Sequence, residues 1–191
     1  MVNISKLYFR YGSMNSSKTA NALMTRFNYV EKGYDVLLLK PSIDNRDRNN
    51  LIKSRIGLEA ECIVFNSVDN LLDLVCETVF VDCVIVDECQ FATVEQIEQL
   101  KKITESIKIP VFCYGLRTDY MSHLFDASKR LFEIADSISE IKSICHCGNK
   151  AIINARYADD RIIYNGEQID IGGNDKYVGL CYKCWKEGNL K

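Results

Sequence analysis

A short polar loop between a strand-like segment and a helix-like segment restricts the fold of this chain more than any other feature. Residues 6–11 are rich in β-forming side chains, and residues 19–32 have the composition of a helix that ends at Gly33. A strand, a loop that begins with glycine and ends in Lys-Thr, and a helix form the pattern of a P-loop, in which backbone N–H groups at the helix N-terminus bind phosphate. The predicted residues of this nucleotide site are Gly12, Ser13, Met14, Asn15, Ser16, Ser17, Lys18 and Thr19.

The last three residues of the loop have separate expected roles. Lys18 is expected to reach the β- and γ-phosphates of ATP, and Thr19 is expected to ligate Mg²⁺. Ser17 departs from the pattern, which has a glycine at this position. A Cβ there crowds the phosphates, or is strained if the position is left-handed, so Ser17 bears on ATP affinity rather than on fold. An ordinary strand–turn–helix that contains a lysine is the alternative interpretation.

A second motif lies where the apolar residues 82–86 end in a pair of carboxylates. A nearly all-apolar strand suits burial on both faces of a parallel sheet. Asp87 stands where a Walker B aspartate helps to hold Mg²⁺, although capping of a turn is its structural alternative. Glu88 can accept a proton from an attacking hydroxyl group or water. We therefore predict Asp87 and Gln90 in the cofactor site and Glu88 as the catalytic base.

Further strand-like and helix-like segments alternate along most of the chain. Strands are expected at 34–40, 61–65, 82–86, 109–114 and 139–144, and helices at 69–78, 93–107 and 131–135. This alternation predicts right-handed βαβ units and a mostly parallel sheet flanked by helices, which is the α/β class of P-loop NTPases. Thr93 and Gln96 form a predicted capping box, and the polar residues 41–60 are expected to be a long functional loop. One face of the first helix is predicted to carry Ala22, Leu23, Phe27 and Val30.

The character of the chain changes after residue 144. Residues 151–157 and 161–164 flank Ala-Asp-Asp and predict a β-hairpin. We expect residues 1–144 to form the nucleotide-binding domain. Residues 145–191 are expected to form a small zinc-binding domain that carries a polar, glycine-containing loop.

Four of the nine cysteines form two close pairs near the C-terminus. Cys145 and Cys147 are separated by one residue, and Cys181 and Cys184 by two. In a chain whose N-terminus runs into a strand and reads as no signal peptide, such pairs favour metal ligation over disulfides and indicate the cytoplasm. Four thiolates enclose Zn²⁺ in a closed tetrahedral site, which is structural rather than catalytic. We expect zinc to hold the polar loop before the second pair, with His146 as an alternative ligand.

The charge balance argues against a nucleic-acid partner. The formal net charge is −2 and no basic tract stands out, whereas nucleic-acid binding draws much of its affinity from neutralised phosphates. A chain of 191 residues is also too short for the two motor domains of a helicase, in which the string Asp-Glu-x-Gln occurs. Because the sequence has no uninterrupted apolar run of about 18 residues, we expect no membrane partner either.

Taken together, the motifs resemble those of one family. The strings Asp-Glu-Cys-Gln-Phe at 87–91, Gly-Leu-Arg-Thr-Asp-Tyr at 115–120 and Ile-Gly-Gly-Asn-Asp-Lys-Tyr at 171–177 are similar to those of type II thymidine kinases, the cytosolic and bacterial kind. The similarity runs nearly end to end. It implies transfer of the γ-phosphate of ATP to the 5′-hydroxyl of deoxythymidine, in pyrimidine salvage for DNA synthesis. It also implies a homotetramer and feedback inhibition by deoxythymidine triphosphate (dTTP).

The same resemblance implies a thymine pocket. A loop through residues 168–172 resembles the family's lasso, which closes over the base and binds its polar edge largely through main-chain groups. Tyr120 is expected to stack on the base or to border it, and Arg46 and Arg55 are candidates for positive charge over the phosphates. The implied substrate-binding residues are Met14, Phe91, Leu116, Tyr120, Phe125, Gln168, Ile169, Asp170, Ile171, Gly172 and Tyr177.

Two other classes of function stay open at this point. The first is a P-loop ATPase that acts on a partner, in which Glu88 activates water. The second is a zinc-bearing nucleic-acid-binding module with a vestigial P-loop. ADP formation without thymidine favours the first, and a salt-dependent shift of DNA favours the second. The kinase hypothesis requires that Lys18 and Glu88 face a common cavity.

Overall fold

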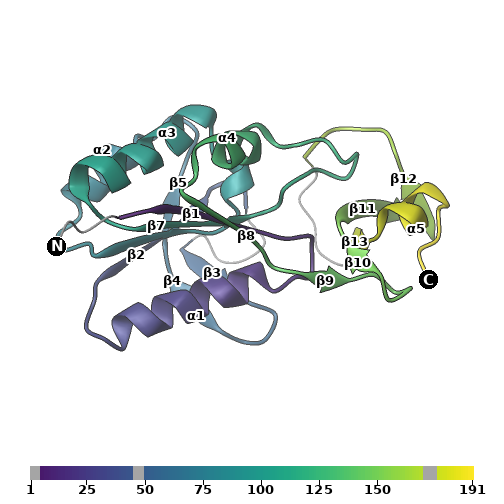
Figure 1. Cartoon of the computed structure of the whole chain (residues 1–191), viewed down its shortest axis with the longest axis horizontal. Coiled ribbons are helices and arrows are strands. Elements are labelled where there is room, and N and C mark those ends of the chain that lie inside the picture. The colour runs from purple at the N-terminus through teal and green to yellow at the C-terminus, as the bar shows by residue number, and fades with distance from the viewer. Residues whose placement is uncertain (1–4, 45–49, 170–175) are drawn as a thin grey trace.

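A six-stranded parallel sheet forms the body of the computed structural model, which describes residues 5–44, 50–169 and 176–191 (Figure 1). The strand order is β5-β2-β6-β7-β1-β8, and the neighbouring strands pair in parallel. The predicted α/β class is thereby confirmed. The strands are β1 (Leu7–Tyr11), β2 (Val36–Pro41), β5 (Ile63–Phe65), β6 (Cys83–Val86), β7 (Val111–Gly115) and β8 (Ser137–Glu140).

Helices cover both faces of this sheet (Figure 1). One face carries α2 (Leu71–Glu77), α3 (Val94–Lys102) and α4 (Asp126–Ile134), and the other carries α1 (Lys18–Val30) with the hairpin of β3 (Leu51–Lys53) and β4 (Glu59–Glu61). Along each strand, the side chains alternate between the apolar cores on the two faces of the sheet. Leu37 and Leu39 pack on the α2–α4 side, whereas Leu38 packs with α1. Burial on both faces is why these strands read as continuous apolar runs.

The start of α3 follows its sequence signal. Thr93 Oγ1 accepts a hydrogen bond from Gln96 N at 3.1 Å, and Gln96 Oε1 accepts one from Thr93 N at 3.0 Å. The predicted capping box is therefore present. A π-helical turn, Ile103–Ile107, extends the helix to the predicted end.

Two segments differ from their predicted structure. The polar residues 41–60 contain the β3–β4 hairpin instead of forming a plain loop, because Ile52 anchors the hairpin in the core beside α1. The segment predicted as one strand at 139–144 is divided. Strand β8 completes the parallel sheet, and β9 (Ser143–Ile144) pairs with β10 (Lys150–Ala151) in a separate antiparallel pair.

The apolar face predicted for α1 is buried only in its first half. Ala22 and Leu23 are buried, but Phe27 is 62% exposed and Val30 is also exposed. At about 100° per residue, Tyr29 rather than Phe27 lies on the side of Ala22. Accordingly, Tyr29 packs against the core between α1 and the sheet.

The remaining elements form what we call the C-terminal ribbon, residues 143–169 and 176–191. Besides β9 and β10, it consists of β11 (Ile153–Ala158), β12 (Arg161–Ile163), β13 (Tyr177–Leu180) and α5 (Tyr182–Lys186). The hairpin β11–β12 confirms the predicted one. Asp159 and Asp160 form its turn with φ of 49° and 56°, as a tight hairpin turn requires. The ribbon has its own core and lies beyond the carboxyl ends of β1 and β7 (Figure 1).

Candidate active site

The loop between β1 and α1 passes through a space that only glycine fits. Gly12 N donates a hydrogen bond to Gly115 O, at the end of the neighbouring strand β7, at 3.2 Å. A Cβ on Gly12 would lie 2.5 Å from Ile141 O and would overlap the side chain of Ser16. The glycine therefore lets the phosphate loop, residues 12–19, run close against the end of the sheet.

Two residues of the phosphate loop have left-handed backbone conformations. Asn15 has a φ of 67°, and Ser17 has a φ of 62° and a ψ of 32°. Ser17 is the position where the sequence pattern has a glycine, and glycine adopts this conformation without steric cost. The serine instead holds the shape of the loop under strain. Asn21 N donates to Ser17 O at 3.0 Å, which joins this residue to the first turn of α1.

Lys18 and Thr19 begin α1 and turn toward the carboxyl end of β6. Lys18 Nζ donates a hydrogen bond to Ser13 O at 2.9 Å, so the lysine also closes the phosphate loop on itself. Thr19 forms a side-chain hydrogen bond with Asp87. The two sequence motifs are therefore in direct contact.

Asp87 is a buried carboxylate whose ionisation is strongly perturbed. Its pKa is raised to about 7, mainly by burial and secondly by the adjacent charge of Glu88. The hydrogen bond from Thr19 and the charge of Lys18 act in the opposite direction. Among the described residues, Asp87 Oδ1 has no hydrogen-bond partner. A cation at this position would favour the charged carboxylate.

Glu88 is held by a glutamine two residues later. Gln90 Nε2 donates to Glu88 Oε2 at 2.6 Å, and Gln90 Oε1 accepts from Leu116 N at 2.9 Å. A Cβ on Gly115 would lie 2.6 Å from Gln90 Oε1, so the glycine leaves room for this amide. The side chain that the sequence assigned to the cofactor site thus orients the predicted base. Glu88 has a left-handed φ of 51°.

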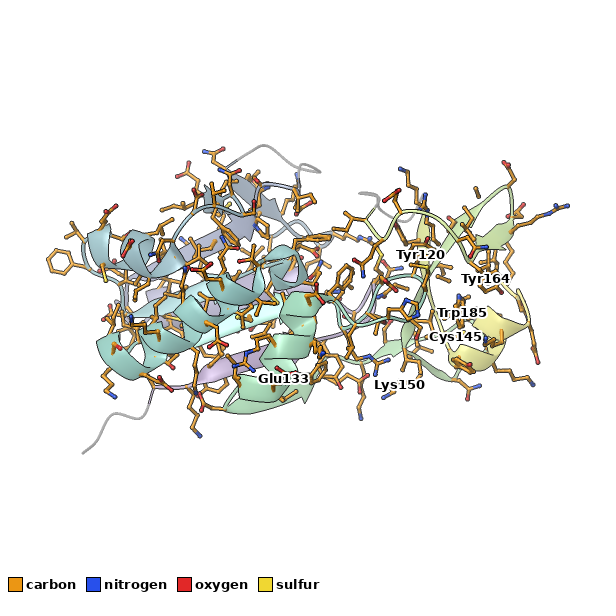
Figure 2. All side chains as sticks on the ribbon, turned by 90° about the horizontal axis from the view of Figure 1, so that it is seen from above. Tyr120, Glu133, Cys145, Lys150, Tyr164 and Trp185 are labelled. Atoms are coloured by element: carbon orange, nitrogen blue, oxygen red, sulfur yellow. The ribbon has the colours of Figure 1, made fainter. Side chains whose placement is uncertain are left out.

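One cavity of about 340 Å³ joins the phosphate loop to an apolar pocket. The two residues on which the kinase hypothesis depends, Lys18 and Glu88, both line it. Tyr120 lies where the sheet meets the C-terminal ribbon (Figure 2). The predicted residues that line the cavity are Met14, Asn15, Ser17, Lys18, Thr19, Asp87, Glu88, Gln90, Phe91, Leu116, Tyr120, Phe125, Gln168, Ile169 and Tyr177.

Other predicted residues do not line this cavity. Gly12, Ser13 and Ser16 are buried residues of the phosphate loop. The lasso residues Asp170, Ile171 and Gly172 lie outside the described residues, as does Arg46. Arg55 does line the cavity, and its guanidinium donates a hydrogen bond to Asn15 Oδ1.

The apolar end of the cavity is aromatic. The rings of Phe91 and Phe125 meet edge to face, with their centroids 5.9 Å apart. Tyr120 packs with Met14 and Tyr177, so side chains from three distant segments form one wall. Such a pocket is suited to a flat ring with a few polar groups at its edge.

Three residues of the site escaped the sequence interpretation. Asp119 is buried, and its Oδ2 accepts a hydrogen bond from Gln168 Nε2 at 2.9 Å, which anchors the first residue of the predicted lasso. Arg156 lies over the ring of Tyr120, with its guanidinium carbon 5.2 Å from the centroid. Asn154 bridges two loops of the site. Of these three, only Asp119 lies within one of the sequence strings that resemble the family, at residues 115–120. Nothing in the sequence around Asn154 or Arg156 marks either as a site residue.

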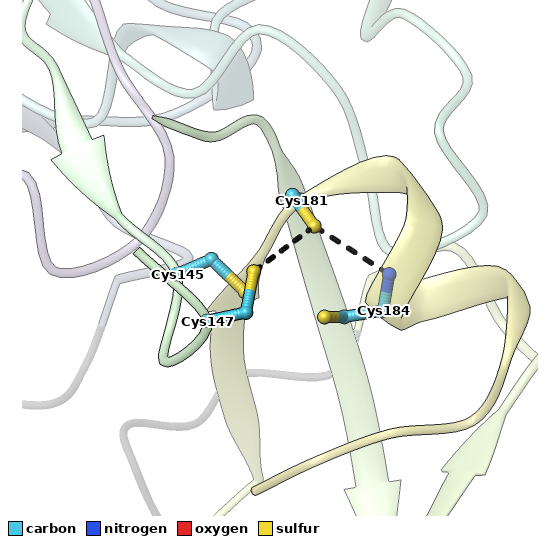
Figure 3. Close-up of side chains that lie close together, drawn as sticks. All are labelled: Cys145, Cys147, Cys181 and Cys184. Atoms are coloured by element: carbon cyan, nitrogen blue, oxygen red, sulfur yellow. Dashed lines mark hydrogen bonds between the residues drawn. The ribbon is translucent and has the colours of Figure 1, made fainter. Parts of the chain in front are cut away.

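The four predicted zinc ligands converge in the C-terminal ribbon (Figure 3). The sulfur atoms of Cys145, Cys147, Cys181 and Cys184 all lie within 4.8 Å of one another. The sulfurs of Cys147 and Cys181 are 3.6 Å apart. A backbone hydrogen bond from Asn149 is the main cause that lowers the pKa of Cys147, to about 6. A lowered pKa favours the thiolate, which is the form that binds metal.

His146 is not part of this cluster. Its Nε2 lies 3.2 Å from Asn189 O, and the side chain is exposed. Among the described residues, the group of potential metal ligands consists of the four cysteines. The alternative in which the histidine replaces a thiolate therefore finds no support.

Comparisons with known proteins agree with this geometry. The thymidine kinase family matches residues 5–185. The thymidine kinase of Legionella pneumophila is 45% identical, with 98% of this chain and 92% of that protein covered. Those of Zymomonas mobilis and Rhodopirellula baltica are 44% and 43% identical, over 93% and 96% of this chain and 94% and 89% of their own lengths. The chain therefore belongs to the thymidine kinase family.

Proposed function

We propose that the protein transfers the γ-phosphoryl group of ATP to the 5′-hydroxyl of deoxythymidine, which yields dTMP and ADP for pyrimidine salvage. Membership of the thymidine kinase family supports the substrate class. The observation that carries the proposal is the cavity that Lys18 and Glu88 share with an aromatic pocket. Direct transfer between two bound molecules requires that both sites open into one space.

Glu88 is proposed as the general base that accepts the proton of the nucleoside hydroxyl. The hydrogen bond from Gln90 holds its carboxylate in one orientation. Because phosphoryl transfer has a loose transition state, placement and charge neutralisation contribute most of the acceleration. We propose that Lys18 and Arg55 supply positive charge beside the phosphates, and that backbone N–H groups of residues 12–19 bind them.

The residues at the end of β6 fit Mg²⁺. Oxygen ligands are those that this ion prefers, and Asp87 offers a buried Oδ1 with no partner among the described residues. A buried polar atom without a partner is costly, and a cation relieves that cost. We propose that Thr19 and Asp87 hold Mg²⁺, which neutralises charge on the phosphate oxygens when it is bound.

The cysteine cluster fits Zn²⁺. A Zn–S distance of about 2.3 Å places tetrahedral thiolates roughly 3.8 Å apart, close to the 3.6 Å between Cys147 and Cys181. We propose a closed structural site, and with it a division of the chain near residue 144 into a nucleotide-binding domain and a zinc-binding domain. The separate core of the C-terminal ribbon supports this division.

We propose that thymine lies in the aromatic end of the cavity. Tyr120 and Phe125 border the base there, and Met14, Phe91, Leu116 and Tyr177 complete the wall. The segment 168–172, which includes Gln168, Ile169, Asp170, Ile171 and Gly172, is proposed to close over the base. The anchoring of Gln168 by Asp119 supports this arrangement, because it fixes the start of that segment at the pocket.

The assembly proposed is a homotetramer in which α1 contributes an interface. Met24, Phe27 and Val30 are exposed apolar residues along one side of α1. A second copy of this chain is the occupant proposed for this stripe.

The continuous cavity also supports inhibition by dTTP, since one molecule that carries both thymine and a triphosphate can occupy both ends.

No helix in the described ranges is long and apolar enough to span a bilayer. We propose the cytoplasm as location, where thiolates remain reduced.

Transfer of labelled γ-phosphate from ATP to a panel of nucleosides tests the proposed function. We expect labelled dTMP with thymidine and negligible ADP formation without a nucleoside. Turnover that does not depend on thymidine would instead favour an ATPase in which Glu88 activates water.

A further inference from the structure

One contact between the C-terminal ribbon and the phosphate loop has no part in the chemistry described so far. Asn154, on β11, is 3% exposed. Its Oδ1 accepts a hydrogen bond from Met14 N at 2.7 Å, and its Nδ2 donates one to Thr118 O at 2.6 Å. A backbone N–H can only donate and a carbonyl can only accept, so the two partners fix the orientation of the amide.

The two partners belong to opposite sides of the active site. Met14 is part of the phosphate loop. Thr118 lies in the segment after β7 whose Leu116 N holds Gln90, the residue that orients the catalytic carboxylate. Asn154 thus connects the donor side of the cavity to the acceptor side through one side chain. Both hydrogen bonds are buried, where loss of a partner leaves a polar group unsatisfied.

The C-terminal ribbon contacts the phosphate loop at a second point. A Cβ on Gly179 of β13 would lie 3.1 Å from Met14 O. Strand β11 presents opposite faces to the two parts of the molecule, because Ile153 and Ala155 pack in the ribbon core beside the cysteines. The ribbon is therefore in contact with the backbone of Met14 from two adjacent strands.

We propose that Asn154 is a positioning residue that sets the phosphate loop against the acceptor side of the cavity. This role rests on the proposed kinase reaction. In it, Asn154 forms no hydrogen bond with either substrate and acts only through Met14 and Thr118. A displacement of about 1 Å between reacting groups costs on the order of 100-fold in rate. Loss of Asn154 should therefore lower kcat more than it changes the KM for thymidine.

Two variants separate the two hydrogen bonds. Asn154→Ala removes both. Asn154→Asp keeps an acceptor for Met14 N but turns a carboxylate oxygen toward Thr118 O. We would measure kcat, both KM values, and the affinity for a fluorescent ATP analogue without nucleoside. We expect both variants to lose about 100-fold in kcat with thymidine KM within about threefold of wild type. Only Asn154→Ala should lose affinity for the analogue, by severalfold.

Two further variants keep the test decisive. Ile153→Val trims the ribbon core but keeps both hydrogen bonds, so its kinetic constants should match wild type. If Asn154→Ala does not fold, Gly179→Ala serves instead, because its methyl group displaces Met14 O, and kcat should fall about 10-fold.

Two results would overturn the proposal. One is an unchanged kcat in both Asn154 variants. The other is a raised thymidine KM with kcat unchanged, which would mean that Asn154, a residue that lines the cavity, contacts the nucleoside itself. If the wild-type protein does not phosphorylate thymidine, the proposed function fails on its own. The binding of the ATP analogue then decides whether Asn154 shapes the phosphate loop.

Discussion

Ser17 and Glu88 hold left-handed backbone conformations that glycine would adopt without cost, with φ of 62° and 51°. Each stands where an element begins, Ser17 before α1 and Glu88 before the short 3-10 helix Cys89–Phe91. Non-glycine residues in this region cost on the order of 1 kcal/mol and persist only where surrounding contacts hold them. The hydrogen bonds from Asn21 to Ser17 and from Gln90 to Glu88 are such contacts. Both strained residues line the cavity.

Relief of this strain at the phosphate loop should be measurable. Ser17→Gly removes about 1–2 kcal/mol of strain from the left-handed backbone of the folded protein. Glycine also raises the conformational entropy of the unfolded chain, which offsets about 0.5–1 kcal/mol of this gain. We expect a free energy of unfolding higher by about 0.5 kcal/mol and a lower KM for ATP. Ser17→Ala keeps the Cβ and is the matched control, which should resemble wild type. Equal stability of the two variants in urea titrations would show that the serine is not strained.

The proposed base can be tested without disturbance of its hydrogen bond. Glu88→Gln has the same shape, and its amide oxygen can still accept from Gln90 Nε2. We expect kcat to fall by about 100- to 10,000-fold, because a positioned base contributes on that order. Binding of a fluorescent ATP analogue, which requires no base, should stay within about twofold of wild type. A kcat near that of wild type would assign the base to another group.

At the scale of elements, the sequence predicted those features of helices, strands and turns that depend on residues close together in the chain. The capping box of α3, the hairpin turn at Asp159 and Asp160, and the apolar strand before Asp87 each depend on neighbours in the chain, and each was predicted. The β3–β4 hairpin was missed, because the tertiary contact of Ile52 stabilises it rather than a strong alternation of its own residues. Asn154 was missed for a similar reason, since its partners lie 140 and 36 residues away.

Asp136 joins three elements and should make stability depend on pH. Its Oδ2 accepts from Leu7 N at 2.8 Å, at the start of β1, and its Oδ1 accepts from Lys101 Nζ at 2.7 Å, at the end of α3. Burial raises the pKa of Asp136, but the hydrogen bonds from Lys101 and Leu7 outweigh it and the net shift is downward. A carboxylate with a lowered folded pKa stabilises above the unfolded value, about 4, and this contribution is lost as the pH falls through the folded pKa.

Asp136→Asn should therefore destabilise the protein at pH 7 and cost little at low pH. We expect a loss of about 0.5–1 kcal/mol at pH 7, with the solvent screening of this partly exposed pair taken into account. Urea unfolding of variant and wild type at pH 7 and near pH 3 measures the difference at each pH. Glu61→Gln, on an exposed edge of β4, is the control and should show no such dependence. A difference that is the same at both pH values would contradict the assignment.

At the scale of the whole molecule, the apolar stripe on α1 should control assembly. Phe27, 62% exposed, is central to the stripe that we assign to an interface between copies. Phe27→Glu places a charge there and should yield smaller particles in light scattering, because burial of an unpaired charge is costly. Phe80→Glu changes a residue that is 79% exposed in another part of the protein, and should leave the particle mass unchanged. A tetramer that survives Phe27→Glu would exclude this face.

Zinc should link the fold of the C-terminal ribbon to thymidine binding. The cysteine cluster lies in a ribbon whose strand β13 contacts the phosphate loop and carries Tyr177 of the proposed thymine pocket. The core of this ribbon is small. Cys184→Ser removes one of four thiolates, so the bound zinc should fall from about one equivalent per chain and the melting temperature should fall with it. The KM for thymidine should rise, because β13, which carries Tyr177, runs directly into Cys181 and loses that anchor. Cys76→Ser alters an exposed thiol outside the cluster and should retain zinc and wild-type kinetics. Elemental analysis, thermal unfolding and steady-state kinetics on the same preparations separate the outcomes. A zinc-free Cys184→Ser protein with unchanged thymidine KM would show that Tyr177 keeps its place without the metal.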